Sequence, residues 1–344
     1  MLLQMSPLKP LRHGVLWTSV ATLILCGVVS PDASRQAAPL NLVSTAWAPF
    51  TNAAGLPRFA LDLVEDALGR TGLTAKTTIV SAPQFTSSLL SDQFDGSAAA
   101  WKDSARERAL VFSQPYLENR LVLVGRRGAD VSAKKLTELA DKRVAIVEGY
   151  SYGDAIELAG PVFMRTRSEE DSLTQLLKGT VEYTLIDELV VHHIVGIYPN
   201  ESRTRLQIGS TALLTRPLYF VVSRRRADAE SIIARFNAEL RGMMADRTYH
   251  RVLQVDWIRA DVDGDGVPEY VPRNDRLGPT EPQQIYSLSS PSEPESTKTG
   301  ISRFYVGGNI YDSWTSVPES YKESNPRYSE PPSRPGGPIF KFAW

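Results

Sequence analysis

Short strand-like runs alternate with helical patterns from Leu40 to Trp257, and this alternation constrains the fold more than any other feature of the chain. Residues 59–70 (FALDLVEDALGR) place apolar side chains at the 3.6-residue period of a helix. Similar patterns predict helices at 168–179 and 227–244. The expected strands are 40–45, 77–80, 96–100, 120–125, 143–147, 183–186 and 219–223. Strands separated by helices favour an α/β sheet of crossover units.

The composition is that of an ordinary globular protein. The 344 residues are 42% hydrophobic and 22% charged, which is enough material for two separate cores. A formal net charge of -1, with Lys and Arg spread along the chain, argues against a nucleic-acid partner, because binding phosphates needs a basic surface. Residues 278–344 are rich in Pro, Ser, Gly and Glu without any period, so we expect a disordered tail there.

The N-terminal residues 1–35 predict a secretory signal peptide, because basic residues precede an apolar run from Val15 to Val29. That run is shorter than the roughly 20 residues that a membrane-spanning helix needs. We therefore expect an exported, periplasmic protein. The single cysteine, Cys26, lies inside this segment, so the mature protein would hold no disulfide. The sequence around Cys26 resembles a lipobox, but Leu25 stands where that motif has a small residue, which disfavours a lipid anchor.

The stretch from Trp101 to Tyr116 (WKDSARERALVFSQPY) combines a candidate anion clamp with a buried strand. Arg106 and Arg108 lie in a helical turn directly before the apolar pair Val111 and Phe112. Arg binds carboxylates well, because its guanidinium donates two parallel hydrogen bonds. The alternative is an exposed Arg-Glu-Arg face of a short helix.

The order of motifs in this stretch, E-R followed by F-S-x-P-Y, resembles the bacterial extracellular solute-binding proteins of family 3, the polar amino-acid-binding proteins of ABC transporters. Residues 42–50 resemble the first strand of that family and the loop after it. Residues 178–188 resemble its "G-x-v-D-a-x-x-x-D" strand, and residues 217–222 its return strand. The resemblance covers about residues 40–257. It implies an α/β fold of the periplasmic binding protein-like type II, with two lobes joined by two hinge strands.

The resemblance also implies a domain organisation for the whole chain. The expected parts are a signal peptide at 1–35, the first part of lobe 1 at 36–126, lobe 2 at 127–215, the return part of lobe 1 at 216–260, a candidate calcium loop at 261–277 and the Pro/Ser-rich tail at 278–344.

Four polar site residues follow from the resemblance. Arg106 occupies the family's place for the arginine that binds the ligand carboxylate. Tyr150 and Ser151 precede a predicted helix in lobe 2, where backbone N–H groups and a hydroxyl can hold the same carboxylate from the other side. Asp187 falls where the family binds the ligand's α-ammonium group. The alternative for Asp187 is a helix-capping residue.

Aromatic residues complete the expected site, with Trp47 and Phe50 packing on the body of the ligand. The alternative for Trp47 is a Trp at the edge of the core. Trp101 and Asp103 are also candidate ligand contacts, but here the chain departs from the family, which has hydroxyl residues. A carboxylate at Asp103 would repel an anionic ligand group unless it turns away or pairs with Lys102.

An acidic loop after the resemblance region is the one candidate metal site. Asp261, Asp263 and Asp265 occupy positions 1, 3 and 5 of an EF-hand-like pattern, with Glu269 at position 9. Pro272 stands at position 12, where an EF-hand has its bidentate Glu. Calcium binding is one interpretation, and an Asp-Gly turn without metal is the other. We expect no further cofactor.

The expected function is a periplasmic solute-binding protein, not an enzyme, that captures an amino acid or related carboxylate by hinge closure. Its partner would be an ABC transporter permease in the inner membrane, and we expect a monomer. A ligand sensor is one alternative. Another is a serine hydrolase, because Gly149–Gly153 fits G-x-S-x-G with Asp187 and His250 following. A third is a prephenate-type dehydratase that uses a carboxylate in the cleft, Asp103 or Asp187, as an acid.

Overall fold

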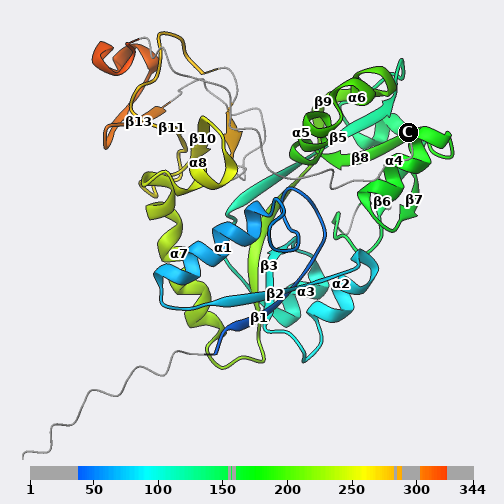
Figure 1. Ribbon diagram of the computed structural model, residues 1–344, viewed down its shortest axis with the longest axis horizontal. Helices are drawn as coiled ribbons and strands as arrows, with labels where there is room; N and C mark the ends of the chain where they lie inside the picture. Colours follow the sequence, from blue (N-terminus) through cyan, green and yellow to red (C-terminus); the bar gives the residue numbers. More distant parts are fainter. Residues whose placement is uncertain (1–37, 154–155, 157–159, 283–284, 289–302, 324–344) are drawn as a thin grey trace, which may run out of the picture. The chain divides into compact units, whose positions relative to one another are not determined.

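A nine-stranded mixed sheet organises most of the chain in a computed structural model, which describes residues 38–153, 156, 160–282, 285–288 and 303–323 (Figure 1). The predicted signal peptide and Cys26 lie outside the described residues. The strand order is β2-β1-β3-β9-β5-β8-β6-β7, and β4 also pairs with β9. The bounds are β1 Leu40–Thr45, β2 Ala75–Val80, β3 Gly96–Ala100, β4 Leu110–Phe112, β5 Leu117–Arg126, β6 Arg143–Val147, β7 Val162–Thr166, β8 Tyr183–Asp187 and β9 Leu206–Ser223.

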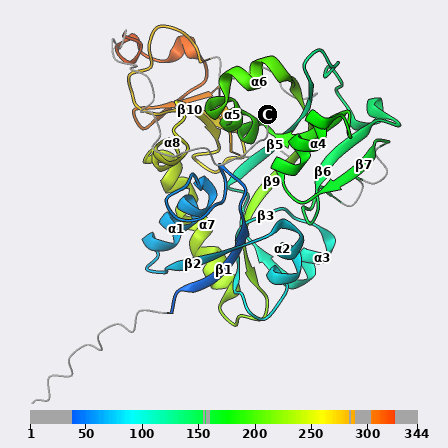
Figure 2. The ribbon, with the colours of Figure 1, turned by 45° about the vertical axis from the view of Figure 1, so that its right-hand side comes forward.

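Strands β5 and β9 connect the two halves of this sheet. They pair with each other in antiparallel fashion from Leu117 and Leu218 to Arg126 and Leu206, side by side in Figure 2. The C-terminal part of β9 also pairs with β3 and β4, whereas β5 pairs with β8 of the other half. Two lobes joined by two long strands confirm the predicted periplasmic binding protein-like type II fold.

Helices flank both halves of the sheet, and three of them follow the predicted patterns closely. Helix α1 (Phe59–Arg70) buries the apolar face that its period indicates. Helix α4 (Glu169–Lys178) begins after Ser168, whose side chain accepts a hydrogen bond from the Asp171 N–H, and ends at Gly179 in the left-handed conformation. The others are α2 Ala82–Leu89, α3 Ser104–Ala109, α5 Glu188–Ile197, α6 Pro199–Arg205, α7 Ala229–Ala245 and α8 Thr248–Leu253. No helix among the described residues is long and apolar enough to cross a membrane.

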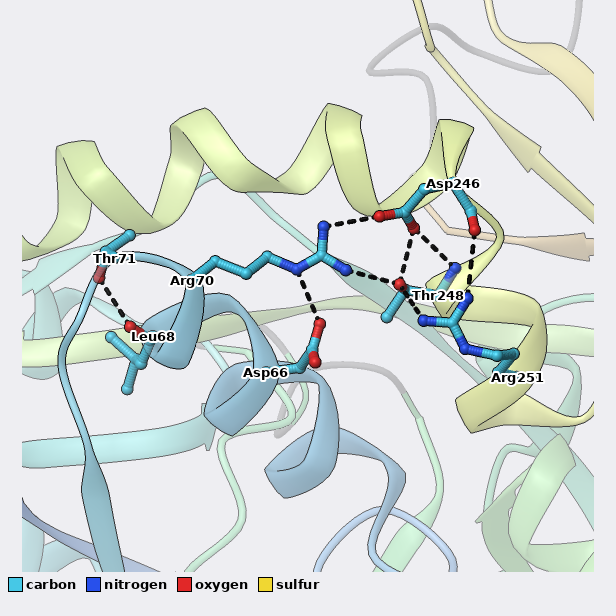
Figure 3. Close-up of polar contacts among 7 residues, drawn as sticks. All are labelled: Asp66, Leu68, Arg70, Thr71, Asp246, Thr248 and Arg251. Atoms are coloured by element: carbon cyan, nitrogen blue, oxygen red, sulfur yellow. Dashed lines mark hydrogen bonds and ion pairs between the residues drawn. The ribbon is translucent and has the colours of Figure 1, made fainter.

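A polar network fixes α1 to the two helices that return to the first lobe (Figure 3). The Arg70 guanidinium donates to Asp66 of its own helix (2.9 Å), to Asp246 after α7 (2.7 Å) and to Thr248 at the start of α8 (2.7 Å). Arg251 also donates to the Thr248 hydroxyl at 2.7 Å. One planar guanidinium thus holds three helix ends, which an ammonium could not do with the same geometry.

The prediction of a disordered tail over 278–344 is wrong for part of that region. A second, five-stranded sheet has the order β12-β10-β11-β13-β14, and three of its strands, β12, β13 and β14, come from the predicted tail. Ring contacts explain why, because Phe304 packs against Trp257 and Trp314 at centroid distances of 6.3 and 5.4 Å and so builds a small core. The bounds are β10 Trp257–Ala260, β11 Glu269–Pro272, β12 Tyr286–Ser287, β13 Arg303–Val306 and β14 Asn309–Tyr311.

Candidate functional site

Arg106 lies in a buried position where the two lobes meet, and protein atoms already occupy most of its donors. Its side chain extends from α3, whose N-cap Asp103 accepts a hydrogen bond from the Arg106 N–H at 2.7 Å. The guanidinium donates to the carbonyl of Trp101 (3.0 Å), to the hydroxyl of Thr86 (2.9 Å) and to the carbonyl of Gly149 in the second lobe (3.2 Å). The residue is only 2% exposed, so the alternative of an exposed helix face is wrong for Arg106, while it describes Arg108.

Asp103 turns toward Arg106 and Ser151. Its Oδ2 lies 3.5 Å from Arg106 Nε, and Lys102 pairs instead with Glu107 at 2.7 Å. Although burial raises the pKa of Asp103, hydrogen bonds from Ser151 and from the backbone together with the Arg106 charge outweigh it and lower that pKa. Burial lowers the pKa of Arg106, and the Asp103 carboxylate acts against that shift. The expected repulsion at Asp103 is therefore relieved by Arg106 and not by Lys102.

An aromatic cluster, formed by Trp47, Phe50, Trp101, Tyr150 and Tyr152, fills the space in front of Arg106. The Trp47 ring meets Trp101 edge to face at 5.5 Å and Tyr150 at 5.6 Å, and Phe50 packs behind it at 4.5 Å. The cavity that remains has about 30 Å³, which leaves room for on the order of one water molecule. Its lining brings together five predicted residues, namely Trp47, Trp101, Arg106, Tyr150 and Ser151.

Asp187 ends β8 and caps α5, as its alternative interpretation expected. Its Oδ1 accepts hydrogen bonds from the Leu189 and Val190 N–H groups at 2.8 and 3.4 Å. Its Oδ2 accepts from Asn119 Nδ2 and the Arg120 N–H at 3.1 and 3.0 Å. Burial raises its pKa to about 7, although these hydrogen bonds act in the opposite direction. Asp187 and Phe50 do not line the cavity at Arg106, and the ammonium contact of Asp187 stays a prediction.

Glu169 is a buried acid that was not predicted as a site residue. It is the first residue of α4 and only 5% exposed, and its Oε2 has no hydrogen-bond partner among the described residues. Burial and, to a smaller extent, the nearby Asp187 charge together raise its pKa to about 8. Three consecutive acids at 169–171 indicated only a helix N-terminus, so nothing in the sequence indicated that Glu169 is buried.

A second and larger cavity lies beside Glu169. Its volume is about 400 Å³, and residues of both lobes line it. The first lobe contributes residues 46–48, Asn52, Leu56 and 80–82, and the second lobe contributes Tyr150 and 167–170. Trp47 and Tyr150 therefore form part of the wall of both cavities.

The hydrolase arrangement is not formed. His250 is buried in α8, and its Nε2 bonds to the Val271 carbonyl at 2.9 Å, while its Nδ1 has no partner among the described residues. Burial lowers the pKa of His250 to about 4. Since Asp187 caps α5 and neither ring nitrogen of His250 bonds to Ser151 or Asp187, the three residues do not make a triad.

The acidic loop between β10 and β11 contacts an arginine of the C-terminal region. Carboxylate oxygens of Asp261, Asp263 and Asp265 lie within 4.8 Å of one another. Arg303 of β13 lies 2.7 Å from Asp265, 3.2 Å from Asp263 and 3.2 Å from the fully buried Glu269. A guanidinium thus already pairs with three of the four acids predicted to bind calcium, and calcium binding stays a prediction.

Comparisons with known proteins agree with the fold. The model of the family "bacterial extracellular solute-binding proteins, family 3" matches residues 43–259. An arginine 3rd transport system periplasmic binding protein from Legionella pneumophila has a similar structure, with 18% identity and a TM-score of 0.52 over 63% of this chain and 98% of that chain. A search of curated proteins found no match to the sequence.

Two further structures share the fold at similar levels. An ancestral arginine-binding protein bound to arginine has 21% identity and a TM-score of 0.52, over 63% of this chain and 96% of that chain. The GluR0 ligand-binding core from Nostoc punctiforme in complex with (L)-glutamate has 19% identity and a TM-score of 0.52, over 63% and 98%. Since the family model matches well over half of the chain, the chain belongs to the bacterial extracellular solute-binding proteins of family 3 and has a solute-binding role.

Proposed function

We propose that the protein captures an amino acid or a related small carboxylate between its lobes in the periplasm and presents it to an ABC transporter permease. The hydrogen bond between Arg106 of the first lobe and the Gly149 carbonyl of the second carries this proposal, because it joins the two lobes through the residue predicted to bind the carboxylate. A solute carboxylate can take over the Arg106 donors that now bond to protein carbonyls. Ser151, which lines the same cavity, would contact it from the second lobe.

The closed cavity at Arg106, about 30 Å³, is too small for an amino acid, so binding requires the aromatic cluster to move. Trp47 and Tyr150 meet from opposite lobes, so opening the hinge separates them and exposes Arg106. Ligand would then be enclosed between the rings as the lobes close again. The structural neighbours named for arginine and glutamate support the amino-acid class.

Thermal unfolding of the exported chain with each of the common amino acids and several small carboxylates tests the proposal. Binding to the native state alone stabilises it by about 2.7 kcal/mol at a ligand concentration of 100 times Kd, so the true ligand class should raise the melting temperature. Arg106→Lys keeps the charge but loses the bidentate geometry, and we expect a roughly 10-fold or larger loss of affinity. Failure of every amino acid and carboxylate to shift the melting temperature contradicts the proposal, as does unchanged binding by Arg106→Lys.

A sensor role is the second candidate, and the C-terminal region favours it. This region follows the part of the chain that the family model matches, and its Tyr286 hydroxyl donates to the Glu118 carbonyl on hinge strand β5 at 3.0 Å. Ligand-driven hinge motion would then reach residues 257–323. Hydrogen exchange with and without ligand tests this, because a pure carrier should show protection changes only around the cleft.

We propose that the protein binds its solute without converting it. The unformed arrangement of Ser151, Asp187 and His250 supports this proposal. A fluorophosphonate probe should leave Ser151 unlabelled, and incubation with prephenate should release no phenylpyruvate. Labelling of Ser151, or formation of phenylpyruvate, would replace the binding role with an enzymatic one.

A further inference from the structure

Two buried carboxyl groups lie near each other behind the cleft, and their hydrogen bonding differs completely. Asp187 accepts four hydrogen bonds from protein N–H groups. Glu169, which senses the Asp187 charge, has a buried Oε2 with no donor among the described residues. An unsatisfied buried carboxyl group is costly, so such a group in a native protein indicates a missing partner.

The cavity beside Glu169 is suited to a cationic partner. It has about 400 Å³ and is walled on one side by Trp47 and Tyr150, whose ring faces attract cations. Glu170, which is half-buried, lines it as well, and Arg167 is the one basic residue of its lining. A guanidinium or ammonium group here would meet an acceptor without a competing protein donor.

We propose that Glu169 binds the cationic group of the solute and makes the protein selective for amino acids with a cationic side chain. This inference rests on the proposed function. Trp47 and Tyr150 form a wall shared by the cavity at Arg106 and the cavity at Glu169, so movement of these rings joins the two spaces. One ligand then places its carboxylate at Arg106 and its cationic end at Glu169. Asp187, with all its bonds made to the protein, takes no part in this contact.

The protonation state of Glu169 supplies a second signature. With a pKa of about 8, most of the free carboxyl is protonated at pH 7, and a bound cation favours the ionised form. Binding of a cationic ligand should therefore release protons near neutral pH. The titratable groups that act on Glu169 or share its cavity are Asp187, Tyr150, Tyr152, Arg167 and Glu170.

Calorimetric titration of the exported chain with L-arginine and L-citrulline tests the proposal, because citrulline has nearly the same shape with a neutral ureido group. We expect arginine to bind about 10-fold or more tightly than citrulline, and Glu169→Gln to weaken arginine by roughly 10- to 100-fold while changing citrulline about twofold at most. Titrations at pH 7 in two buffers of different ionisation enthalpy should show proton release with arginine, and Glu169→Gln should abolish it.

Glu230→Gln is the control, since it removes an exposed carboxylate from α7, outside both cavities. It should keep arginine affinity within about threefold. Equal affinity of wild type and Glu169→Gln for arginine overturns the inference, as does an equal loss in Glu230→Gln. If neutral amino acids bind and arginine has no advantage, the inference fails but the proposed function stands. If no amino acid binds, both fail.

Discussion

Arg106 and Glu169 are both ionisable side chains buried where the lobes meet, yet they differ in how far the protein bonds their polar atoms. The Arg106 Nε has no hydrogen bond among the described residues and lies 3.5 Å from the Asp103 carboxylate, but the other two nitrogens donate to protein oxygens. Arg106 is 2% exposed and donates to Trp101, Thr86 and Gly149. Glu169 is 5% exposed and its Oε2 has no donor among the described residues. A buried ionisable group that is hydrogen-bonded by the protein stabilises the closed structure. A buried group without such hydrogen bonds costs stability, and it is retained when a ligand supplies the missing bond. The two residues should therefore respond in opposite ways to substitution.

Replacing Arg106 should have the largest effect on stability. Arg106→Ala removes the donor of the Trp101 carbonyl, leaves the Gly149 carbonyl with the Thr86 hydroxyl alone and opens a void, so we expect a loss of about 3–5 kcal/mol in the free energy of unfolding. Urea denaturation without ligand measures it. Arg108→Ala, an exposed position of the same helix, should change stability by less than about 0.5 kcal/mol. A loss below about 1 kcal/mol for Arg106→Ala would mean that its contacts are not structural.

Gly149 lies where closure brings the lobes into backbone contact, and it should show the next largest effect. Its φ is +82°, and a Cβ there would clash with the Ala82 carbonyl of the first lobe. Gly149→Ala should therefore hinder closure and weaken amino-acid binding about 100-fold, or about 2.7 kcal/mol. Calorimetry with the amino acid that stabilises wild type measures this.

Gly128→Ala is the matched control for the backbone, since its φ is +84° and nothing lies within 4 Å of a Cβ there. Both variants should lose about 1–2 kcal/mol of stability from the left-handed conformation. Only Gly149→Ala should lose ligand affinity. If Gly128→Ala weakens binding as much, the contact with Ala82 does not limit closure.

Local patterns were sufficient for part of the fold. Helix α1 has the predicted bounds, and α4 lies between the Ser168 cap and Gly179, because periodicity and capping act within one segment. Burial of Glu169 depends on residues far away in sequence, including Trp47 and Asp187, so its role could not be predicted from three adjacent acids. The C-terminal strands were missed for the same reason.

The five residues that gather at the first cavity were all candidates from the sequence, although Trp101 stands where the chain departs from the family. The size of that cavity was not predicted, because it depends on how Trp101 packs. The Trp101 Nε1 donates a hydrogen bond to Asn119 Oδ1 at 2.7 Å, and Asn119 Nδ2 in turn donates to Asp187 Oδ2. Residue types at matching positions thus indicated which side chains meet. The volume of the cavity between them could be determined only from the structure.

Glu169→Gln should make the protein more stable at alkaline pH. Burial raises the folded-state pKa of Glu169 to about 8 from an ordinary 4.5, so the folded protein holds this proton more tightly than the unfolded chain. The contribution of the Glu169 carboxyl group to the free energy of unfolding therefore falls as pH rises from about 4.5 to about 8, and it is constant at higher pH. Relative to pH 5, the variant should gain on the order of 4 kcal/mol over wild type at pH 9.

Urea denaturation of both proteins at the two pH values, without ligand, measures this difference. Asp187, whose pKa is also raised by burial, is present in both proteins, and its electrostatic interaction with Glu169 is part of the difference that is measured. Parallel stability curves for wild type and Glu169→Gln would show that the carboxyl group finds a donor in solution. That result would remove the contrast with Arg106.

The acidic loop should show the smallest effect, because its carboxylates already have a cation from the protein. Arg303 contacts Asp263, Asp265 and Glu269 and is itself largely buried, so calcium must displace it. We expect about 5 mM calcium, above the 10⁻⁴–10⁻³ M range of extracellular sites, to raise the melting temperature of wild type by less than about 1 °C.

Removing the guanidinium reverses this situation. Arg303→Gln leaves the carboxylates of the loop without their cation, as Glu169 is without one in the cleft, so calcium should stabilise this variant more than wild type. Adding Asp265→Asn should abolish the gain if the loop is the binding site. An equal calcium response in wild type and Arg303→Gln would show that Arg303 does not compete with the metal. A carboxyl group with a protein partner would then bind a ligand as readily as one without a partner. The distinction between Asp187 and Glu169 depends on the opposite, namely that a protein partner makes an acid less available to a ligand.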